Sequence, residues 1–416
     1  MMQSVKNKVK LATRGCRPLY RGLQIVWEIA HKIDYAIIRK TCKVDKKLVL
    51  FEAYNGRQYA CSPRALYEQM LRDDAYKDFH FVWAFKDVKK YKWLRDNRNT
   101  TVVEMKSRPY RKIQTSAGYI ITNSIQLGYF RRSEEQVMLQ TWHGTPLKRL
   151  GCDIEIDCEN VSTAEKIHKR YSTRSKEYTH MISPSAFCTE KLTSAFALKQ
   201  NGKEDIMIEK GYPRNDRLIN ATPQDISRLK KEYGIPEGKK VILYAPTYRD
   251  NQKGKKHTGF SYELNLDFDR FLEAMGPDVV ILFRTHYFVA TRFDFSKGDG
   301  RIINVSEVDD INELYLMSDL LITDYSSVFF DFACLKRPVV LYMYDLKEYQ
   351  TAIRDFYIDL KELPFPIVET QDALEDMVIK QLTRFEYDDK YLIFNNKFNY
   401  LEDGQASKRV LDVIMK

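Results

Sequence analysis

The stretch LLITDYSSVFFDFA, residues 320–333, decides the fold of this chain. A short apolar run ends at Asp324, and a second apolar run follows Ser326 and Ser327. This pattern is typical of a strand that leads at its carboxyl end into a helix, the repeating unit of a parallel sheet. The N–H groups at such a helix start can hold a phosphate or pyrophosphate. Asp324 can cap the helix or bind a ligand hydroxyl, although an ordinary capped helix is the simpler explanation of this segment taken alone.

A similar transition is predicted at residues 137–148, VMLQTWHGTPLK, where a histidine closes an apolar run. Gly144 permits a tight turn, Thr145 can cap a helix, and Pro146 suits a first helical position. The pattern therefore predicts a helix that begins beside His143, where a phosphate could also be held. A histidine that merely fills a strand–helix corner accounts for the segment as well.

Short apolar runs alternate with polar, helix-like stretches from residue 48 onward, which favours parallel sheets with helices on both faces. A chain of 416 residues has room for two such units. We expect them to join near residues 215–235 and to enclose a cleft. The predicted divisions are an arm at residues 1–47, a first Rossmann-like domain at 48–220 and a second at 221–416. Strands are expected at 48–54, 80–85, 101–105, 119–122, 137–141, 181–183, 206–208, 240–245, 279–283, 302–305, 320–323, 339–342 and 366–369, and helices at 63–71 and 164–175.

The basic charge of the chain is concentrated in the arm. Residues 1–47 carry 12 Lys or Arg and 3 acids, whereas the whole chain has a net charge of +10. Apolar residues from Leu23 to Ile37 recur at helical spacing, but charged residues interrupt them too often for a bilayer span. A basic amphipathic helix suits the surface of an anionic membrane, and a helix packed on the protein with a solvated basic face is the alternative. No motif for reading nucleic acid is present, so we expect no nucleic-acid partner.

The cysteines, and the polar residues that follow two further predicted strands, indicate which kinds of site the chain can form. Seven cysteines form no CxxC pair, which favours free thiols in a reducing compartment over a zinc site. Thr247 follows one predicted strand, and Arg284 with His286 follows another. Arg284 and His286 resemble an anion clamp, although a loop histidine with a structural role explains the same residues.

Taken together, five motifs resemble the CDP-glycerol glycerophosphotransferases that build teichoic-acid polymers. The motifs are HGTPLK at 143–148, GYPRND at 211–216, YAPTYRD at 244–250, RTH at 284–286 and LLITDYSSVFFDFA at 320–333. The resemblance covers about residues 48–375 and implies a GT-B fold, in which two Rossmann-like domains face a cleft. It also implies a peripheral enzyme at the cytoplasmic face of the cell membrane, with no structural metal and no cofactor.

The resemblance also implies a role for each matching residue. His143 is expected to be the general base that activates the acceptor hydroxyl, and His286 is expected near the donor phosphates. The chain departs from the family's usual pattern at Tyr287, where proline is common, and at residues 364–366, which read Pro-Phe-Pro in place of Pro-Gly-Pro. The expected donor-binding residues are Thr247, Arg284, Asp324, Ser326 and Ser327, and the expected acceptor-side residues are Gly144, Thr145, Arg214 and Asn215.

The expected reaction is transfer of glycerol phosphate from CDP-glycerol to a lipid-linked saccharide or polyol-phosphate acceptor, with release of CMP. CDP-ribitol remains an alternative donor, because the residues that face the polyol cannot be identified from sequence. A GT-B glycosyltransferase would release a nucleoside diphosphate instead, and a non-enzymatic protein that binds anionic polymers would release neither. The sequence leaves the oligomeric state open and is compatible with a homo-oligomer.

Overall fold

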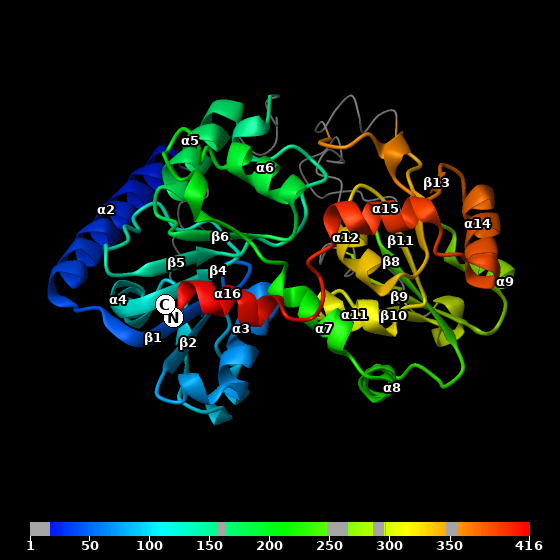
Figure 1. Ribbon diagram of the computed structural model, residues 1–416, viewed down its shortest axis with the longest axis horizontal. Helices are drawn as coiled ribbons and strands as arrows, with labels where there is room; N and C mark the ends of the chain where they lie inside the picture. Colours follow the sequence, from blue (N-terminus) through cyan, green and yellow to red (C-terminus); the bar gives the residue numbers. More distant parts are fainter. Residues whose placement is uncertain (1–16, 156–162, 248–264, 286–294, 296, 347–355) are drawn as a thin grey trace.

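The computed structural model describes residues 17–155, 163–247, 265–285, 295, 297–346 and 356–416. Two parallel sheets, each with helices on both faces, form two domains that lie side by side (Figure 1). Helices α7 (Asp216–Asn220) and α8 (Pro223–Glu232) connect them, inside the predicted junction. His286 and residues 248–250 lie outside the described residues.

The first domain is built on a seven-stranded sheet with the order β3-β2-β1-β4-β5-β6-β7. Chain order reverses between β1 and β4, and ligands of open parallel sheets bind beyond the carboxyl ends of strands at such a switch point. The strands are β1 (Asp45–Glu52), β2 (His80–Phe85), β3 (Thr100–Glu104), β4 (Ala117–Thr122), β5 (Val137–Gln140), β6 (His180–Ser183) and β7 (Met207–Glu209). The helices are α3 (Cys61–Arg72), α4 (Arg108–Ser116), α5 (Ala164–Ser175) and α6 (Ala186–Ala195).

The second domain repeats the design with six strands in the order β10-β9-β8-β11-β12-β13, and its switch point lies between β8 and β11. Its strands at 279–283, 320–323 and 339–342 are buried along their whole length, as the continuous apolar runs predict. The strands are β8 (Lys240–Ala245), β9 (Val279–Phe283), β10 (Ile302–Asn304), β11 (Leu320–Thr323), β12 (Val339–Tyr342) and β13 (Ile367–Val368). The helices are α9 (Phe268–Met275), α11 (Ile311–Met317), α12 (Val328–Phe332), α14 (Gln371–Arg384) and α15 (Asp389–Phe398).

The last helix, α16 (Ala406–Ile414), crosses back from the second domain to the first (Figure 1). Its apolar residues Val410, Leu411 and Ile414 join the core that α3 and β1 form. The chain therefore crosses between the domains twice, which restricts how far they can separate.

Helix α2 (Arg17–Thr41) lies against the outer side of the first domain, as the helical spacing of the arm predicts. Tyr35 and Ile38 are buried, and Asp34 forms an ion pair with Arg111 of α4. Several large apolar side chains on the same helix remain exposed, among them Val26, Ile29, Ile33 and Ile37. The helix thus has one face attached to the protein and one apolar face that the described residues leave uncovered.

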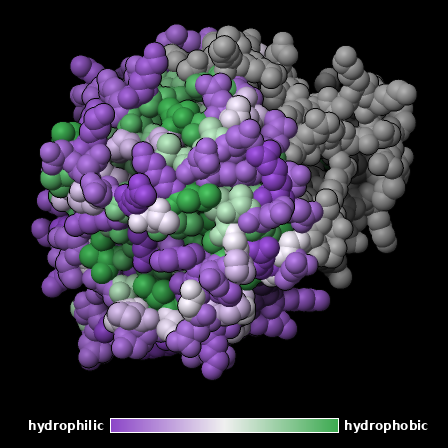
Figure 2. Space-filling model, turned by 90° about the vertical axis from the view of Figure 1, so that its right-hand side faces the viewer, coloured by the Kyte–Doolittle hydropathy of each residue, from purple (hydrophilic) through white to green (hydrophobic). Residues whose placement is uncertain are grey.

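The end of the molecule formed by the second domain has a mixed surface. Figure 2 shows hydrophobic areas divided by hydrophilic side chains on this side. Its exposed apolar residues include Ile379 of α14 and Ile393 of α15. Isolated apolar residues of this kind are ordinary on protein surfaces and indicate no particular partner.

Candidate active site

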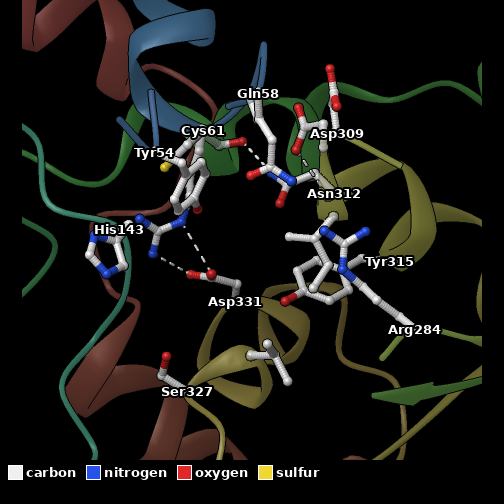
Figure 3. Close-up of a pocket in the computed structure, with 15 residues that line it drawn as sticks. Tyr54, Gln58, Cys61, His143, Arg284, Asp309, Asn312, Tyr315, Ser327 and Asp331 are labelled. Carbon is white, nitrogen blue, oxygen red and sulfur yellow. Dashed lines mark hydrogen bonds and ion pairs between the residues drawn. The ribbon is translucent and has the colours of Figure 1, made fainter. Parts of the chain in front are cut away.

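A cavity of about 200 Å³ lies where the two switch points face each other, and residues of both domains line it (Figure 3). The first domain contributes Tyr54 and His143, which follow β1 and β5. The second contributes Arg284, which follows β9, and Ser327, which precedes α12. Four of the predicted site residues are therefore brought together although they are far apart in sequence: His143, Arg214, Arg284 and Ser327.

His143 is held by the backbone of the neighbouring strand end. Its Nδ1 lies 3.1 Å from the carbonyl oxygen of Asn123, which follows β4. A carbonyl can accept but cannot donate, so Nδ1 carries the proton and Nε2 keeps the lone pair. Asn123 is fixed in turn, because its side-chain oxygen accepts the backbone N–H of Tyr54 at 2.7 Å. The imidazole is thus presented in the tautomer that a general base requires.

The backbone is left-handed at two strand ends of the first domain, beside His143 and after β1. Trp142 has φ +47°, a left-handed conformation, and its N–H donates to the side chain of Gln140 at 2.9 Å. Tyr54 and Asn55 are also left-handed, with φ +48° and +56°. Non-glycine residues in this region carry a strain of order 1–3 kcal/mol, and such residues cluster at functional sites. The strain here aims the rings of Tyr54 and His143 at each other, with centroids 5.7 Å apart.

The prediction of a helix after His143 is wrong. Residues 144–150 form no helix, and their backbone bonds to the second domain instead. The carbonyl of Leu147 accepts the N–H of Tyr357 at 2.9 Å, and Lys148 forms an isolated β-bridge with Phe356. Partners more than 200 residues away therefore satisfy the groups that a helix would have paired locally. His143 is therefore not followed by a helix of its own whose N-terminus could hold a phosphate.

Gly144 lies where the two domains approach each other closely, and its φ is not in the left-handed region. A Cβ added there would lie 2.9 Å from Oγ of Ser327. Thr145 is buried, with 1% of its surface exposed, and it does not line the cavity. The turn after β5 is therefore packed directly against the start of α12.

The pKa of His143 is lowered from 6.5 to about 4, mainly because burial disfavours the charged ring. The positive charge of Arg214 lowers this pKa further, whereas the bond to Asn123 raises it. The ring is exposed by surface area even though the atoms of both domains surround it. At neutral pH the imidazole is therefore uncharged and still accessible from the cleft.

The turn between β11 and α12 has the predicted form with one difference. Ser327 is the N-cap residue of α12, as expected for a helix that starts here. Asp324 does not cap this helix, because both oxygens of its carboxylate accept the backbone N–H of Thr247, at 2.9 and 3.0 Å. Asp324 thus joins the ends of β8 and β11 at the switch point through the backbone of Thr247. Ser326 is half-buried beside it.

Arg284 lies on the opposite wall of the cavity from His143 (Figure 3). Its Nη1 donates to the carbonyls of Val305 and Val308, at 3.3 and 2.8 Å. Burial lowers the pKa of its guanidinium, and nearby acids and tyrosines oppose this shift. These two bonds fix one edge of the guanidinium against the second domain.

Arg214 and Asn215 lie at the junction of the domains, in a short 3₁₀ helix, η5 (Pro213–Asn215). Nε and Nη2 of Arg214 donate to the carboxylate of Asp331 in α12, at 3.1 and 2.8 Å. The side-chain amide of Asn215 donates to the same carboxylate at 3.2 Å. Arg214 lines the cavity, whereas Asn215 does not.

The sequence interpretation missed several residues that line the cavity. Tyr54, Tyr315 and Asp331 were not predicted, although Asp331 is the one acid within the apolar run 328–333. A single acid in such a run is itself a signal of a buried ion pair. Tyr54 and Tyr315 carry no comparable signal, because aromatic residues are frequent throughout the chain.

Two kinds of feature are absent from the residues that the structure describes. Those residues contain no group of three or more His, Cys, Asp or Glu side chains arranged to hold a metal ion. Among them, no helix is both long enough and apolar enough to cross a membrane.

The chain is similar to proteins of teichoic-acid synthesis. Residues 34–416 match the model of the family described as CDP-glycerol:poly(glycerophosphate) glycerophosphotransferase. The chain is 37% identical over 394 residues to the teichoic acid glycerol-phosphate transferase of Staphylococcus aureus (strain NCTC 8325 / PS 47), with 93% of this chain and 98% of the relative covered. It is also 37% identical over 431 residues to the teichoic acid poly(glycerol phosphate) polymerase of Bacillus subtilis (strain 168), where 99% of this chain covers 55% of the relative.

Among solved structures, the wall teichoic acid polymerase TagF superposes with a TM-score of 0.83 at 32% identity. The alignment covers 96% of this chain and 96% of that chain. The predicted GT-B fold, with two Rossmann-like domains facing a cleft, is confirmed by this match and by the two parallel sheets.

Proposed function

This chain belongs to the CDP-glycerol:poly(glycerophosphate) glycerophosphotransferase family, and we propose that it transfers glycerol phosphate from CDP-glycerol to a hydroxyl of a teichoic-acid-type acceptor. The observation that carries the proposal is the neutral imidazole of His143, fixed by Asn123 and placed across a cavity from Ser327. The chain spans 55% of the polymerase from B. subtilis, so the proposal concerns the reaction and not the length of the polymer that is made.

In the proposed reaction, Nε2 of His143 accepts the proton of the acceptor hydroxyl as its oxygen attacks the β-phosphorus of the donor. A new P–O bond forms to the acceptor, the P–O bond to the CMP oxygen breaks, and CMP leaves with the bonding electrons. Positioning and charge stabilisation account for most of the catalysis in phosphoryl transfer. His143 is uncharged near pH 7 because its pKa is lowered, so its Nε2 can accept this proton.

The donor side of the cleft is proposed to bind the pyrophosphate. The backbone N–H groups that follow Ser326 and Ser327 are available at the start of α12, and Arg284 adds a positive charge on the same side. Asp324 and Thr247 hold this turn in place through their hydrogen bonds. His286 is proposed to contact the donor phosphates, and Gly144, Thr145, Arg214 and Asn215 are proposed to belong to the acceptor side.

The test is release of CMP by the purified chain supplied with a lipid-linked saccharide acceptor and either CDP-glycerol or CDP-ribitol. We expect acceptor-dependent CMP from CDP-glycerol, and CMP from CDP-ribitol alone would reassign the donor. Release of a nucleoside diphosphate from a nucleotide sugar, with no CMP from either CDP-polyol, would establish the glycosyltransferase alternative. No tightly bound metal is part of the proposal, so turnover should persist in excess EDTA.

The acceptor is proposed to be membrane-linked, with the enzyme bound peripherally at the cytoplasmic face through α2. The support is the exposed apolar face of this helix, which includes Val26, Ile29 and Ile33, together with the excess of basic residues in the arm. The double variant Ile29→Asp/Ile33→Asp should lose flotation with anionic vesicles yet keep turnover on a soluble acceptor analogue. Loss of both properties in a folded variant would show that α2 is more than an anchor.

A further inference from the structure

Arg214 is held at the cavity by a stacking contact and by hydrogen bonds from two of its guanidinium nitrogens. Its guanidinium stacks on the ring of Tyr212, with the central carbon 3.8 Å from the ring centroid. Two of its nitrogens bind the carboxylate of Asp331, at 3.1 and 2.8 Å. The side-chain amide of Asn312 donates to its backbone carbonyl. The stacking fixes the plane of the guanidinium, and the carboxylate fixes its rotation within that plane.

One guanidinium nitrogen has no partner in this arrangement. Nη1 of Arg214 is buried and forms no hydrogen bond with any of the described residues, and 5% of the residue's surface is exposed. Arg214 lines the cavity that His143 and Arg284 also line. The hydroxyl of Tyr315, another lining residue, is likewise buried without a partner in the described part of the chain. Buried polar groups are nearly always hydrogen-bonded, and a charged N–H is the most costly to leave unpaired.

The acids that line the cavity do not satisfy this nitrogen, because cations or N–H groups of the first domain already engage them. Asp309 pairs with Lys90 at 2.7 Å, and Asp310 pairs with Arg64 at 3.2 Å. Asp331 is the acid that orients Arg214 through its other two nitrogens. The Nη1 edge therefore remains available for an anion that enters the cavity.

We propose that Nη1 of Arg214 donates a hydrogen bond to an anionic phosphoryl oxygen of the substrate, and that Asp331 is the positioning residue for this contact. The inference rests on the proposed function and names a contact for its substrates. Phosphoryl oxygens are the preferred partners of a planar guanidinium, and a preorganised donor is most effective in a site that excludes water. Two sources supply the same chemistry: the phosphoryl group in transfer, and the phosphodiester of the acceptor's terminal unit.

The experiment compares Asp331→Asn, the double variant Arg214→Gln/Asp331→Asn and Arg214→Lys. The first keeps the guanidinium without its carboxylate, and the second removes both charges so that neither is left unpaired in the interior. Arg214→Lys keeps a positive charge for the ion pair but lacks the planar guanidinium that places an N–H at the position of Nη1. The control is Arg64→Gln, which removes another arginine that joins the domains through Asp310 and Glu313 but does not line the cavity.

We expect the double variant to lose about 10²–10³-fold in kcat/KM relative to Asp331→Asn, the usual effect of one preorganised donor to a developing charge. Arg214→Lys should lose at least tenfold relative to wild type, and Arg64→Gln should lose less than the double variant. If the bound oxygen belongs to the transferred phosphoryl group, the variants lose affinity for CDP-glycerol but keep affinity for CMP. If it belongs to the acceptor, the acceptor KM rises while the affinity for CDP-glycerol stays unchanged.

The inference is overturned if Arg214→Lys matches wild type, or if the double variant matches Asp331→Asn, because Arg214 would then serve the domain junction alone. A wild-type chain that releases no CMP from either donor contradicts the proposed function, and the inference falls with it. If the wild type releases CMP and the Arg214 substitutions do not change kcat/KM, the inference is contradicted and the proposed function stands.

Discussion

The two turns that meet in the cleft, residues 142–145 after β5 and residues 324–327 after β11, are built in opposite ways. The first has a strained backbone, with Trp142 at φ +47°, and leads into no helix. The second is a strand–helix turn in which Ser327 is the N-cap residue of α12 and makes no side-chain cap hydrogen bond. The first turn presents one side chain, His143, in a defined tautomer, whereas the second presents backbone N–H groups. We therefore expect a substitution of the side chain at the first turn to reduce catalysis strongly. A side-chain substitution at the second turn should change donor binding only slightly, because the backbone N–H groups remain.

The largest effect is expected for His143→Ala. Loss of the general base should lower kcat by about 10²–10⁴-fold, while the affinity for CDP-glycerol changes little because the donor binds at the other turn. Initial rates of CMP release and donor titration separate these two effects. The matched control is His168→Ala, since His168 lies in α5 and bonds to the carbonyl of Ile154 away from the cavity. Equal losses in both variants would show that the comparison of the two turns is mistaken.

A smaller effect is expected where the turns touch. In Gly144→Ala the new Cβ would lie 2.9 Å from Oγ of Ser327, so the two turns must separate or Ser327 must rotate. Because a 1 Å displacement of reacting groups can cost about 10²-fold, we expect kcat/KM to fall by about 10- to 10²-fold. Adding Ser327→Ala removes the clashing oxygen and should restore activity to the level of Ser327→Ala alone.

The control for this contact is Gly128→Ala, where an added Cβ meets no atom within 4 Å. A double-mutant cycle from initial rates gives the coupling between positions 144 and 327. Strictly additive losses in kcat/KM would mean that positions 144 and 327 are not energetically coupled through this contact.

The conformation of the second turn could be predicted from sequence, whereas that of the first could not, and the reason is physical. Strands β2, β8, β9, β11 and β12 and helix α5 have the predicted bounds, because buried parallel strands are continuous apolar runs between polar segments. The turn after β5 contains local helix-start residues, yet its backbone pairs with residues 356 and 357. A pairing over that separation overrides local preference, and a single sequence does not reveal it.

The same limit applies to the side chains of the site. His143, Arg284 and Ser327 could be named as candidates because each follows a predicted strand at its carboxyl end. The ion pair between Arg214 and Asp331 joins residues 117 positions apart, and neither segment alone identifies the other. Individual groups were therefore predictable, whereas the contacts that orient them were not.

Ser327→Ala tests the robustness expected of the second turn. The hydroxyl of Ser327 makes no side-chain cap hydrogen bond to α12, and the N–H groups at the start of the helix remain after the substitution. The loss is therefore limited to about one hydrogen bond, near 0.5–1.5 kcal/mol, or less than about 15-fold in the affinity for CDP-glycerol. Isothermal titration with CDP-glycerol measures it. A loss as large as that in His143→Ala would mean that the side chain, and not the backbone, binds the donor.

The smallest effect on activity is expected from lowering the pH. Burial and the charge of Arg214 lower the pKa of His143 from 6.5 to about 4, so the neutral base persists to lower pH than in free imidazole. In the free enzyme, which kcat/KM reports, a group with pKa 6.5 would lose about tenfold in base form at pH 5.5, whereas His143 should lose less than about twofold. The folded state, in contrast, loses stability as pH falls from 6.5 toward 4, because the unfolded chain takes up the proton first. A pH series of initial rates, with folding followed by circular dichroism, separates the two effects, and an inflection of kcat/KM near 6.5 in folded protein would show that His143 is not desolvated in the cleft.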